Sequence, residues 1–273
     1  MNERPPPAGK GSGKPPQEPK PTPTGILIVD KPIGPTSMSV CARVRGALRG
    51  AGAPKGIKVG HGGTLDPLAT GVLVVLVGKA TRLCNKIMVG EKEYLATLDL
   101  SRFSVTDDAE GPFEEVSVTT PPTREEVERA AAKFVGTIEQ MPPRYSALNI
   151  GGMRAYDMAR QGMAVPLSAR TVEIHEIRVL GYEWPRVELD VRCGKGVYIR
   201  SLARDIGTAL GTGGMIAALR RTRVGRFTLE GAVGRDDLPR KLTQADLRPI
   251  PEDLLQTDPL QPPAADETSA QPE

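Results

Sequence analysis

The chain has few of the residues on which metal, redox and disulfide chemistry depend. Among its 273 residues there are two histidines and three cysteines, and aromatic side chains make up only 4%. Cys41, Cys84 and Cys193 are widely spaced and form no CxxC motif, and no histidine stands near them at metal-ligand spacing, which argues against a disulfide framework or a zinc site. None of the three stands in a motif that marks an activated thiol. We therefore expect no metal and no other cofactor.

Long hydrophobic runs are also missing. The longest, VLVVLV at residues 72–77, is far too short to span a bilayer, and the N-terminus lacks the apolar core of a signal peptide. We therefore expect no membrane partner and a cytoplasmic location. No heptad pattern or long apolar edge indicates an obligate protein partner, so we expect a monomer.

The two ends of the chain have too few apolar residues to bury a core. Residues 1–24 contain eight prolines and no Ile, Leu, Val or Phe, and residues 251–273 are similar in kind but acidic. This composition predicts two disordered tails, 1–24 and 251–273, around one folded domain at residues 25–250. The tails carry charges of +2 and −6, which leaves +7 on the domain although the whole chain has a net charge of only +3.

Positive charge is concentrated in residues 192–226, where eight cations stand against a lone Asp205. Such a cluster suits a polyanion, because each neutralised phosphate releases counterions. A solvated basic face is the alternative. The eight cations are Arg192, Lys195, Arg200, Arg204, Arg220, Arg221, Arg223 and Arg226.

The apolar periodicity predicts an α/β fold with a mixed sheet, because strands and helices alternate without regular βαβ spacing. Thr36 or Ser37 is expected to cap a first helix that ends near Leu48, and Thr123 and Glu126 form a capping box for a second. The expected strands are 25–31, 71–78, 91–100, 171–181, 186–193 and 224–231. The expected helices are 36–48, 79–88, 124–135, a short one within 144–161, one from 199, and one at 215–221.

The stretch VGHGGTLDPLATGVL, residues 59–73, combines four glycines with a histidine and an aspartate. A P-loop would need GK followed by Ser or Thr, and the nearby Gly78-Lys79 is followed by alanine. A dinucleotide-binding GxGxxG would need a glycine where Asp66 stands. A metal site would rest on His61 and Asp66, and the only other histidine is in a distant strand-like segment. All three interpretations are therefore disfavoured.

What remains is one carboxylate on a glycine-rich turn. Asp66 precedes Pro67, whose ring fixes the local backbone, and the preceding glycines let a ligand come close. Aspartate in an Asp-Pro step is often only a turn former or a helix N-cap, so the local pattern alone favours a structural role. A nucleophilic carboxylate needs a cation that keeps it ionised, and Arg200 is a candidate.

Five blocks of the chain form a pattern more specific than any single motif. They run in order from about Gly25 to about Glu230 and read GILIVDKPIGPTS, KVGHGGTLDPLATGVLVVLVGKATRL, KEYLATLDL, MPPRYSALNIGGMRAYDMARQG and CGKGVYIRSLARDIG. Together they resemble the TruB-type tRNA pseudouridine synthases. The resemblance implies the pseudouridine synthase fold, with a central mixed sheet flanked by helices. It also implies a bacterial-like member, here expected to lack the C-terminal RNA-binding PUA domain of many relatives.

The resemblance implies roles for three residues in the chemistry. Asp66 stands where the family has its nucleophilic aspartate. Arg200, in YIRS, matches the arginine that pairs with this nucleophile. Tyr94 matches the tyrosine that stacks on the target base, and it is a candidate for proton abstraction.

The resemblance also implies binding and supporting residues. His61, Tyr198 and Leu219 match positions that line the uridine pocket or pack on the flipped nucleotide. Lys31 and Pro32 match an early motif that we interpret as support for the active-site loop. By their own local patterns, the histidine would be a loop residue, the tyrosine a core aromatic and the leucine part of a helix core.

The activity implied by the resemblance is isomerisation of uridine 55 in the T loop of tRNA. The base would leave the stack at a cost of about a few kcal/mol. The N1–C1′ bond would break and the uracil would rejoin through C5, with Asp66 attacking C1′ or C6. The basic segment 192–226 would bind phosphates of the T arm, so that binding weakens with salt.

Two local departures from the family pattern and three rival functions remain. Gly62 stands where bacterial relatives usually have threonine, and the family's TDTxDxxG loop reads SVTDDAEG here, with Val105 replacing an aspartate and Asp108 retained. A non-catalytic RNA-binding protein would be favoured by loss of Asp66 or Arg200, and both are present. A guide-RNA-dependent synthase would need a longer C-terminal region and protein partners. A thiol-dependent uridine methyltransferase would need an activated cysteine.

Overall fold

The computed structural model describes residues 22–146 and 148–256. Its main feature is a mixed sheet whose principal strands lie in the order β14-β1-β3-β12-β4-β11-β10-β7, with β2 added to β3 and β13 added to β12. These strands are β1 (Gly25–Lys31), β2 (Val59–His61), β3 (Ala69–Val77), β4 (Lys92–Asp99), β7 (Gly136–Gln140), β10 (Arg170–Glu183), β11 (Arg186–Cys193), β12 (Met215–Val224), β13 (Phe227–Thr228) and β14 (Val233–Gly234).

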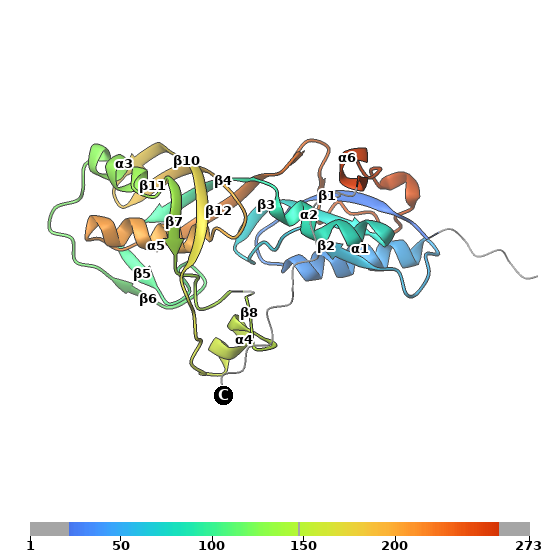
Figure 1. The fold of residues 1–273 in the computed structure, drawn as a ribbon, viewed down its shortest axis with the longest axis horizontal. Coiled ribbons are helices and arrows are strands. Elements are labelled where there is room, and N and C mark those ends of the chain that lie inside the picture. Colours follow the sequence, from blue (N-terminus) through green and yellow to red (C-terminus); the bar gives the residue numbers. More distant parts are fainter. Residues whose placement is uncertain (1–21, 147, 257–273) are drawn as a thin grey trace, which may run out of the picture.

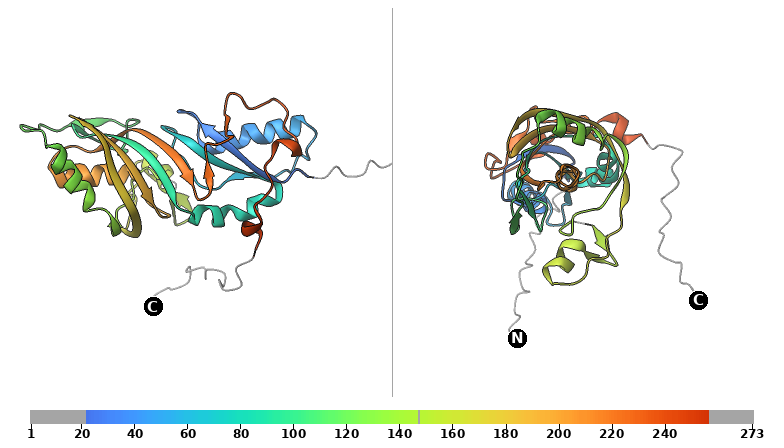
Figure 2. Two further views of the ribbon diagram at one scale, coloured as in Figure 1. Left: turned by 90° about the horizontal axis from the view of Figure 1, so that it is seen from above. Right: turned by 90° about the vertical axis from the view of Figure 1, so that its left-hand side faces the viewer.

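Helices and small hairpins pack around this sheet. In Figures 1 and 2, α1 and α2 lie at one end of an elongated body and α3 and α5 at the other. The helices are α1 (Ser37–Gly50), α2 (Cys84–Val89), α3 (Arg124–Ala132), α4 (Ala155–Arg160), α5 (Ile199–Leu210) and α6 (Glu252–Leu255), with 3-10 turns η1 (Gly78–Leu83) and η2 (Gln244–Asp246). The hairpins are β5 (Arg102–Ser104) with β6 (Phe113–Glu115), and β8 (Asn149–Ile150) with β9 (Met153–Arg154).

Strand β3 is buried on both faces, as its unbroken apolar sequence predicts. Leu73 and Val75 pack in one core with Val44 of α1. Val74 packs in a second core with Ile87 of α2. The loop that carries Asp66 therefore leads directly into a strand that is packed on both sides, which gives the loop a rigid support.

One predicted helix is wrong. Residues 215–221 belong to strand β12, which pairs in parallel with β3 and antiparallel with β4. The segment MIAALRR is rich in good helix formers, but the place it fills in the centre of the sheet overrides that local preference. Leu219 is therefore a strand residue, paired with Ala69 and Ala96. The helix expected at 79–88 is instead split into η1 and α2.

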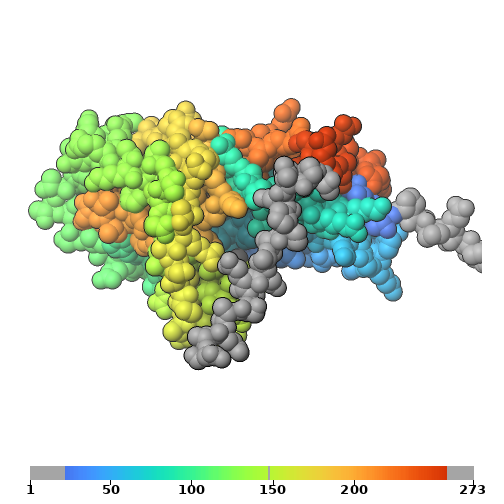
Figure 3. Space-filling view, in the orientation of Figure 1, coloured from blue at the N-terminus to red at the C-terminus, as the bar shows by residue number. Residues whose placement is uncertain are grey.

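The strand expected at 224–231 is also wrong, because residues 225 and 226 form a turn and only β13, Phe227–Thr228, is extended beyond the end of β12. Most of the other predicted elements are found close to their expected positions. Thr36 caps α1 by accepting a hydrogen bond from the backbone of Ser39. The capping box of α3 is formed by Thr123 and Glu126. Residues 144–161 contain a small hairpin followed by α4, and this segment protrudes from the body in Figure 3. The mixed-sheet α/β class is confirmed.

Residues 1–21 and 257–273, most of the two predicted tails, lie outside the described residues. Packing continues beyond residue 250, because Arg226 forms an ion pair with Asp253 of α6 and the Lys86 ammonium donates to the Leu254 carbonyl. In the described part of the chain, no helix is long and apolar enough to cross a membrane.

Candidate active site

A cavity of about 400 Å³ opens where β3, β4 and β12 approach the start of α5. The structure brings five of the six predicted site residues to its wall. They are Asp66 on the loop before β3, Tyr94 on β4, Leu219 on β12, Tyr198 just before α5 and Arg200 in its first turn. Segments far apart in the chain therefore converge on one concave site, as a binding site for a flipped base requires.

Asp66 and Arg200 form an ion pair at this cavity. Arg200 Nε lies 2.9 Å from Asp66 Oδ2, and the Asp66 side chain remains 34% exposed. The guanidinium is itself fixed, because Nη1 lies 3.2 Å from Asp108 Oδ2 and donates to the Thr106 carbonyl. A further hydrogen bond runs from Nη2 to the Tyr145 carbonyl. Arg200 therefore holds one face of Asp66 while the other remains open to the cavity.

The electrostatic state of Asp66 depends on several neighbours. Burial raises the pKa of Asp66, the positive charge of Arg200 opposes that rise, and the nearby Asp108 adds to it. Two carboxylates thus share one arginine, so the guanidinium is not devoted to either alone. A carboxylate held at a raised pKa is more basic and more nucleophilic than an exposed one when it is ionised.

The Asp66 loop is held through its backbone. Ser37 at the start of α1 donates to the Leu65 carbonyl at 2.9 Å and accepts from the Leu65 amide at 2.8 Å. The buried Lys31 ammonium donates to the Pro67 carbonyl. The residues on both sides of the aspartate are therefore fixed, which orients its carboxylate without occupying it.

Arg221 holds the glycine-rich part of the same loop from the sheet. Its buried guanidinium donates to the carbonyls of Val72, Thr64 and Gly63 at 2.9 to 3.1 Å. Gly71 is required nearby, because its φ is +100° and an added Cβ would lie 2.1 Å from the Arg221 carbonyl oxygen. Strand β12 thus contributes the anchor that shapes the approach to Asp66.

Tyr94 lies on β4 beside this anchor, with only 8% of the residue exposed. Burial raises the pKa of Tyr94, while the positive charge of Arg221 and a side-chain hydrogen bond to it act in the opposite direction. The phenol therefore carries its proton in the resting cavity. Its ring lines the cavity and can stack on a base.

Tyr198 is positioned by a buried glutamine. Its backbone amide donates to Gln140 Oε1 at 2.8 Å, and its carbonyl accepts from Gln140 Nε2 at 3.1 Å. This bidentate contact fixes the entry to α5 and hence the direction of Arg200, two residues later. Gln140 comes from β7, at the far edge of the sheet, and nothing in its local sequence identified it.

His61 is not brought to the wall of this cavity. It lies on β2, paired with Val75 of β3, and burial together with Arg221 lowers its pKa, so the ring is neutral. The following Gly62 is enforced by packing, because a Cβ there would lie 2.4 Å from Ile87 Cγ2. The threonine usual at this position in bacterial relatives would require Ile87 to move.

Sequence reasoning missed the roles of Asp108, Arg221 and Gln140. Asp108 was noted as a retained loop residue, but its contact with Arg200 depends on a turn in which Asp107 adopts a φ of 60°. Arg221 was counted only as part of a basic cluster. Had residues 215–221 been assigned to a strand, the alternation of side chains would have placed Arg221 on the same buried face as Leu219. An arginine on a buried face is the signal that could have identified it.

The basic segment 192–226 does not present its charge as predicted. Two of its arginines are buried, at 4% exposure for Arg200 and 2% for Arg221. Six of the eight cations form ion pairs with carboxylates from other parts of the fold, including Arg223 with Glu91 and Glu93. These acidic partners stand outside the segment in sequence, which is why the local count of charges was misleading.

Metal-binding side chains do not gather in the described residues. No group of three or more His, Cys, Asp or Glu side chains there could hold a metal ion. Cys41 and Cys193 are buried with raised pKa values, because burial disfavours their thiolates.

The fold is shared with proteins in two solved assemblies. The chain is similar to a protein in the crystal structure of a Cbf5-Nop10-Gar1 complex, with a TM-score of 0.59 and 33% identity, covering 78% of this chain and 53% of that one. It is also similar to a protein in the structure of an H/ACA RNP bound to a substrate RNA containing 2′-deoxyuridine, with a TM-score of 0.58 and 31% identity over 78% of this chain and 52% of that one. The chain thus spans about half of each of these proteins. Fold and cavity together define the class as pseudouridine synthase-like.

The particular family follows from sequence comparison. Residues 52–199 match the model described as TruB family pseudouridylate synthase (N terminal domain), and residues 200–256 match the tRNA pseudouridylate synthase B C-terminal domain. A tRNA pseudouridine synthase B of Phocaeicola vulgatus is 43% identical over 82% of this chain and 96% of its own length. One of Thermobifida fusca is 48% identical over 80% of this chain and 75% of its own length. The chain belongs to the TruB family of pseudouridylate synthases, which are isomerases, and the resemblance inferred from its five sequence blocks is confirmed.

Proposed function

We propose that this enzyme converts uridine 55 in the T loop of tRNA to pseudouridine, with Asp66 as the nucleophile. The substrate class is supported by its relatives from Phocaeicola vulgatus and Thermobifida fusca, each named a tRNA pseudouridine synthase B. The single observation that carries the role of Asp66 is its place at the cavity, with Arg200 Nε 2.9 Å from one carboxylate oxygen and the side chain partly exposed.

The reaction requires one bond to break and one to form, with no net redox change. The N1–C1′ bond breaks, the uracil turns within the cavity, and a C5–C1′ bond forms. C5 then loses its proton and N1 carries one in the product. Ionised Asp66 attacks C1′ or C6 and is released when the new glycosidic bond is complete, so the carboxylate is regenerated.

Tyr94 has two roles in this proposal. Its ring stacks on the flipped uracil and offsets part of the cost of unstacking, while Leu219 and Tyr198 close the cavity around it. Its hydroxyl then assists loss of the C5 proton. Because burial raises the Tyr94 pKa, the phenol holds its proton at rest. It accepts the C5 proton while its own proton passes, through water, to N1 of the uracil, so that the phenol is regenerated and no resting phenolate is needed.

The test is to incubate an unmodified tRNA transcript with the purified protein and to map pseudouridine at nucleotide resolution. The expected result is one new pseudouridine at the T-loop position, and none in a transcript in which that uridine is replaced by cytidine. Modification at another position, or no modification of any uridine, would contradict the proposed substrate.

The same experiment separates this function from a guide-RNA-dependent one. The similarity to a protein from the Cbf5-Nop10-Gar1 complex is the observation that favours a guide. A purified transcript contains no guide and no partner protein. Turnover that begins only when guide RNA and partners are added would replace the present proposal with the guide-dependent one.

We also propose that the enzyme acts as a monomer in the cytoplasm. The sequence shows no heptad pattern or long apolar edge that would indicate an obligate partner, which supports a monomeric catalytic unit. A cytoplasmic location follows from tRNA as the substrate. Sedimentation of the purified protein with and without tRNA measures its oligomeric state.

A further inference from the structure

Residues 31–90 are charged almost entirely with one sign. They contain nine lysines and arginines, and their only acidic residue is Asp66. The nine are Lys31, Arg43, Arg45, Arg49, Lys55, Lys58, Lys79, Arg82 and Lys86. In the described ranges 22–146 and 148–256, none of the nine lies within 4.0 Å of a carboxylate oxygen. Their charge is therefore not neutralised by the fold.

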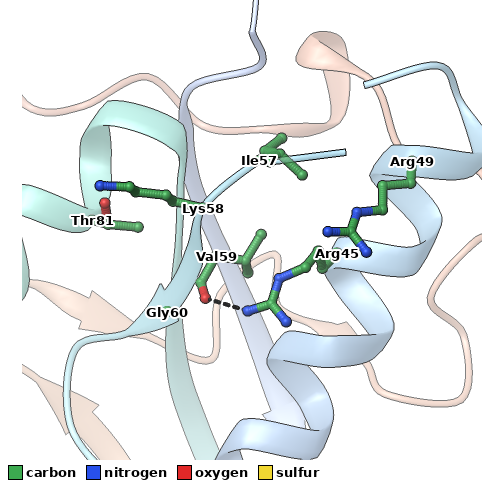
Figure 4. A pocket seen from close by; sticks show the side chains of 8 residues that line it. Arg45, Arg49, Ile57, Lys58, Val59, Gly60 and Thr81 are labelled. Atoms are coloured by element: carbon green, nitrogen blue, oxygen red, sulfur yellow. Dashed lines mark hydrogen bonds between the residues drawn. The ribbon is translucent and has the colours of Figure 1, made fainter. Parts of the chain in front are cut away.

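Three of these cations gather at a second cavity, of about 450 Å³. Arg45 and Arg49 project from successive turns of α1, and Lys58 lies on the facing segment with its side chain directed toward Thr81 and away from the two guanidiniums (Figure 4). We refer to this site as the α1 pocket. The α1 pocket is separate from the active site, because the two cavities share no lining residue.

The α1 pocket retains hydrogen-bonding capacity. Arg45 donates from Nη2 to the Val59 carbonyl at 2.9 Å, and Arg49 donates from Nη2 to the Lys55 carbonyl. Each guanidinium carries five N–H donors in a planar fork, so donors remain for a ligand. Planar forks of this kind suit phosphate oxygens, which can accept two parallel hydrogen bonds.

The floor of the α1 pocket is open to a close approach. Gly56 and Gly60 line it, and no heavy atom lies within 4 Å of the position that a Cβ would take at either residue. A bulky, highly charged group can therefore reach the backbone between α1 and β2.

The α1 pocket also has a defined relation to the active site. Ser37, in the first turn of α1, binds Leu65 next to the catalytic carboxylate. Arg45 and Arg49 lie about 12 and 18 Å further along the same helix, at 1.5 Å per residue. On the other wall, β2 runs from Gly60 at the pocket toward Gly63 at the active-site cavity. A single RNA molecule can therefore reach both sites.

We infer that the α1 pocket binds a backbone phosphate of the RNA substrate, at a distance from the target uridine. This inference rests on RNA being the substrate. The ligand is a phosphodiester of the RNA chain and not a free anion, because further exposed cations adjoin the pocket residues in the chain: Arg43 on α1, Lys55 before Gly56 and Arg82 after Thr81. Each of them can meet a further phosphate of a polyanion. The pocket therefore contributes affinity and register, and the Asp66 site contributes chemistry.

The test replaces two exposed cations together, in the variant R49Q/K58Q. The matched control is R129Q/K133Q, which removes one exposed arginine and one exposed lysine from α3 or just after it, at the opposite end of the body (Figure 1). The ligand for binding is tRNA that already contains pseudouridine, so that no reaction intervenes. Affinity is measured from 50 to 300 mM salt, and turnover is measured with unmodified tRNA.

The expected result for R49Q/K58Q is an affinity about tenfold weaker at low salt, and a slope of log K against log salt that is smaller by about 1.5 to 2. Its KM rises in proportion and its turnover at saturating tRNA stays unchanged. The control keeps the wild-type slope. An unchanged slope in R49Q/K58Q overturns the inference, as does an equal loss in the control.

Two outcomes distinguish failure of the proposed function from failure of the α1 pocket inference. If wild-type protein forms no pseudouridine in tRNA, the proposed function has failed. If wild-type protein is active and R49Q/K58Q binds tRNA as tightly as wild type, only the α1 pocket inference has failed. Inorganic phosphate serves as a separate probe: protection of the α1 pocket by phosphate alone, with the tRNA slope unchanged, assigns the pocket to free anions and also overturns the inference.

Discussion

Residues 192–226 and residues 31–90 are both rich in arginine and lysine, but the fold uses their charges differently. In residues 192–226, six cations are paired with carboxylates, and Arg221 is buried against backbone carbonyls. In residues 31–90, none of the nine cations has a carboxylate partner among the described residues. The first segment therefore supplies Arg200 and Arg221 to the site. The cations of the second segment, apart from the buried Lys31, remain at least partly exposed and without carboxylate partners among the described residues.

The number of charges in a stretch of sequence therefore does not identify a nucleic-acid surface. Strand β12 lies beside β4, so Arg223 meets Glu91 and Glu93 although the sequence separates them widely. Such pairing depends on sheet order, which no local pattern reveals. Four changes test this difference between the two segments and the site that the first one supports.

Among the cations, the largest effect is expected at Arg200, which forms an ion pair with the proposed nucleophile Asp66. In R200Q, Asp66 and Asp108 lose their shared counter-ion, so turnover should fall by about 10²- to 10³-fold. The free energy of unfolding should fall by about 3 to 5 kcal/mol, because buried carboxylates lose their partner. Single-turnover assays and urea denaturation measure the two effects. The control is R204Q, which breaks the Arg204–Asp107 pair on the same helix; it should retain turnover within a few-fold, and an equal loss there would contradict a role specific to Arg200.

The next effect is expected at Arg221, the buried anchor of the loop. R221K keeps the positive charge. An ammonium, however, cannot replace the planar guanidinium whose three nitrogens donate to the carbonyls of Val72, Thr64 and Gly63. Misplacement of the Asp66 loop should lower turnover by about 10²-fold while tRNA affinity stays near the wild-type value. A loss of affinity larger than the loss of turnover would show that Arg221 acts on RNA and not on the loop.

The pH dependence should reveal the raised pKa of Asp66, whose main cause is burial. Asp66 must be ionised to attack, so kcat/KM should fall as pH decreases through this raised pKa, at a higher pH than for an ordinary aspartate. The same shift means that folding favours the protonated form, so the contribution of Asp66 to stability is lost as pH rises through that range. D66N should therefore be more stable than wild type at neutral pH. An acid limb at the pH of an exposed aspartate would contradict this account.

The smallest effect is expected for the exposed paired cations. In R192Q/R226Q, two arginines are removed whose charges are already matched by Glu91, Glu176 and Asp253. tRNA affinity should change by less than about twofold and stability by less than about 1 kcal/mol. The measurement is a tRNA binding titration of R192Q/R226Q and of R49Q/K58Q under the same conditions. An equal loss of affinity in the two double variants would contradict the distinction between the two segments.

Much of the fold could be predicted from the sequence where one physical rule dominates. The apolar run of β3, the alternation of β4 and the capping box at Thr123 each indicated the correct element. The prediction was wrong at residues 215–221. Ala, Leu and Arg favour a helix locally, but this segment pairs with both β3 and β4 and must therefore be a strand. Local preference could not reveal that tertiary demand.

The site was predicted unevenly for a similar reason. Asp66, Arg200 and Tyr94 stand in recognisable sequence blocks, and the cavity gathers them. The residues that hold them in place come from segments without a motif: Asp108 from a turn, Gln140 from an edge strand and Arg221 from the strand that was mistaken for a helix. Their roles arise from hydrogen bonds to carbonyls and side chains brought close by the fold, which sequence spacing does not encode.

The most direct test of the central claim compares wild type with D66N on the same unmodified tRNA. The account predicts that D66N binds tRNA within about twofold of wild type, because the phosphate-binding cations of residues 31–90 are untouched. It also predicts that D66N forms no pseudouridine in a single-turnover assay at saturating enzyme. Pseudouridine formation by D66N at a rate within about tenfold of wild type would contradict the assignment of Asp66 as the nucleophile.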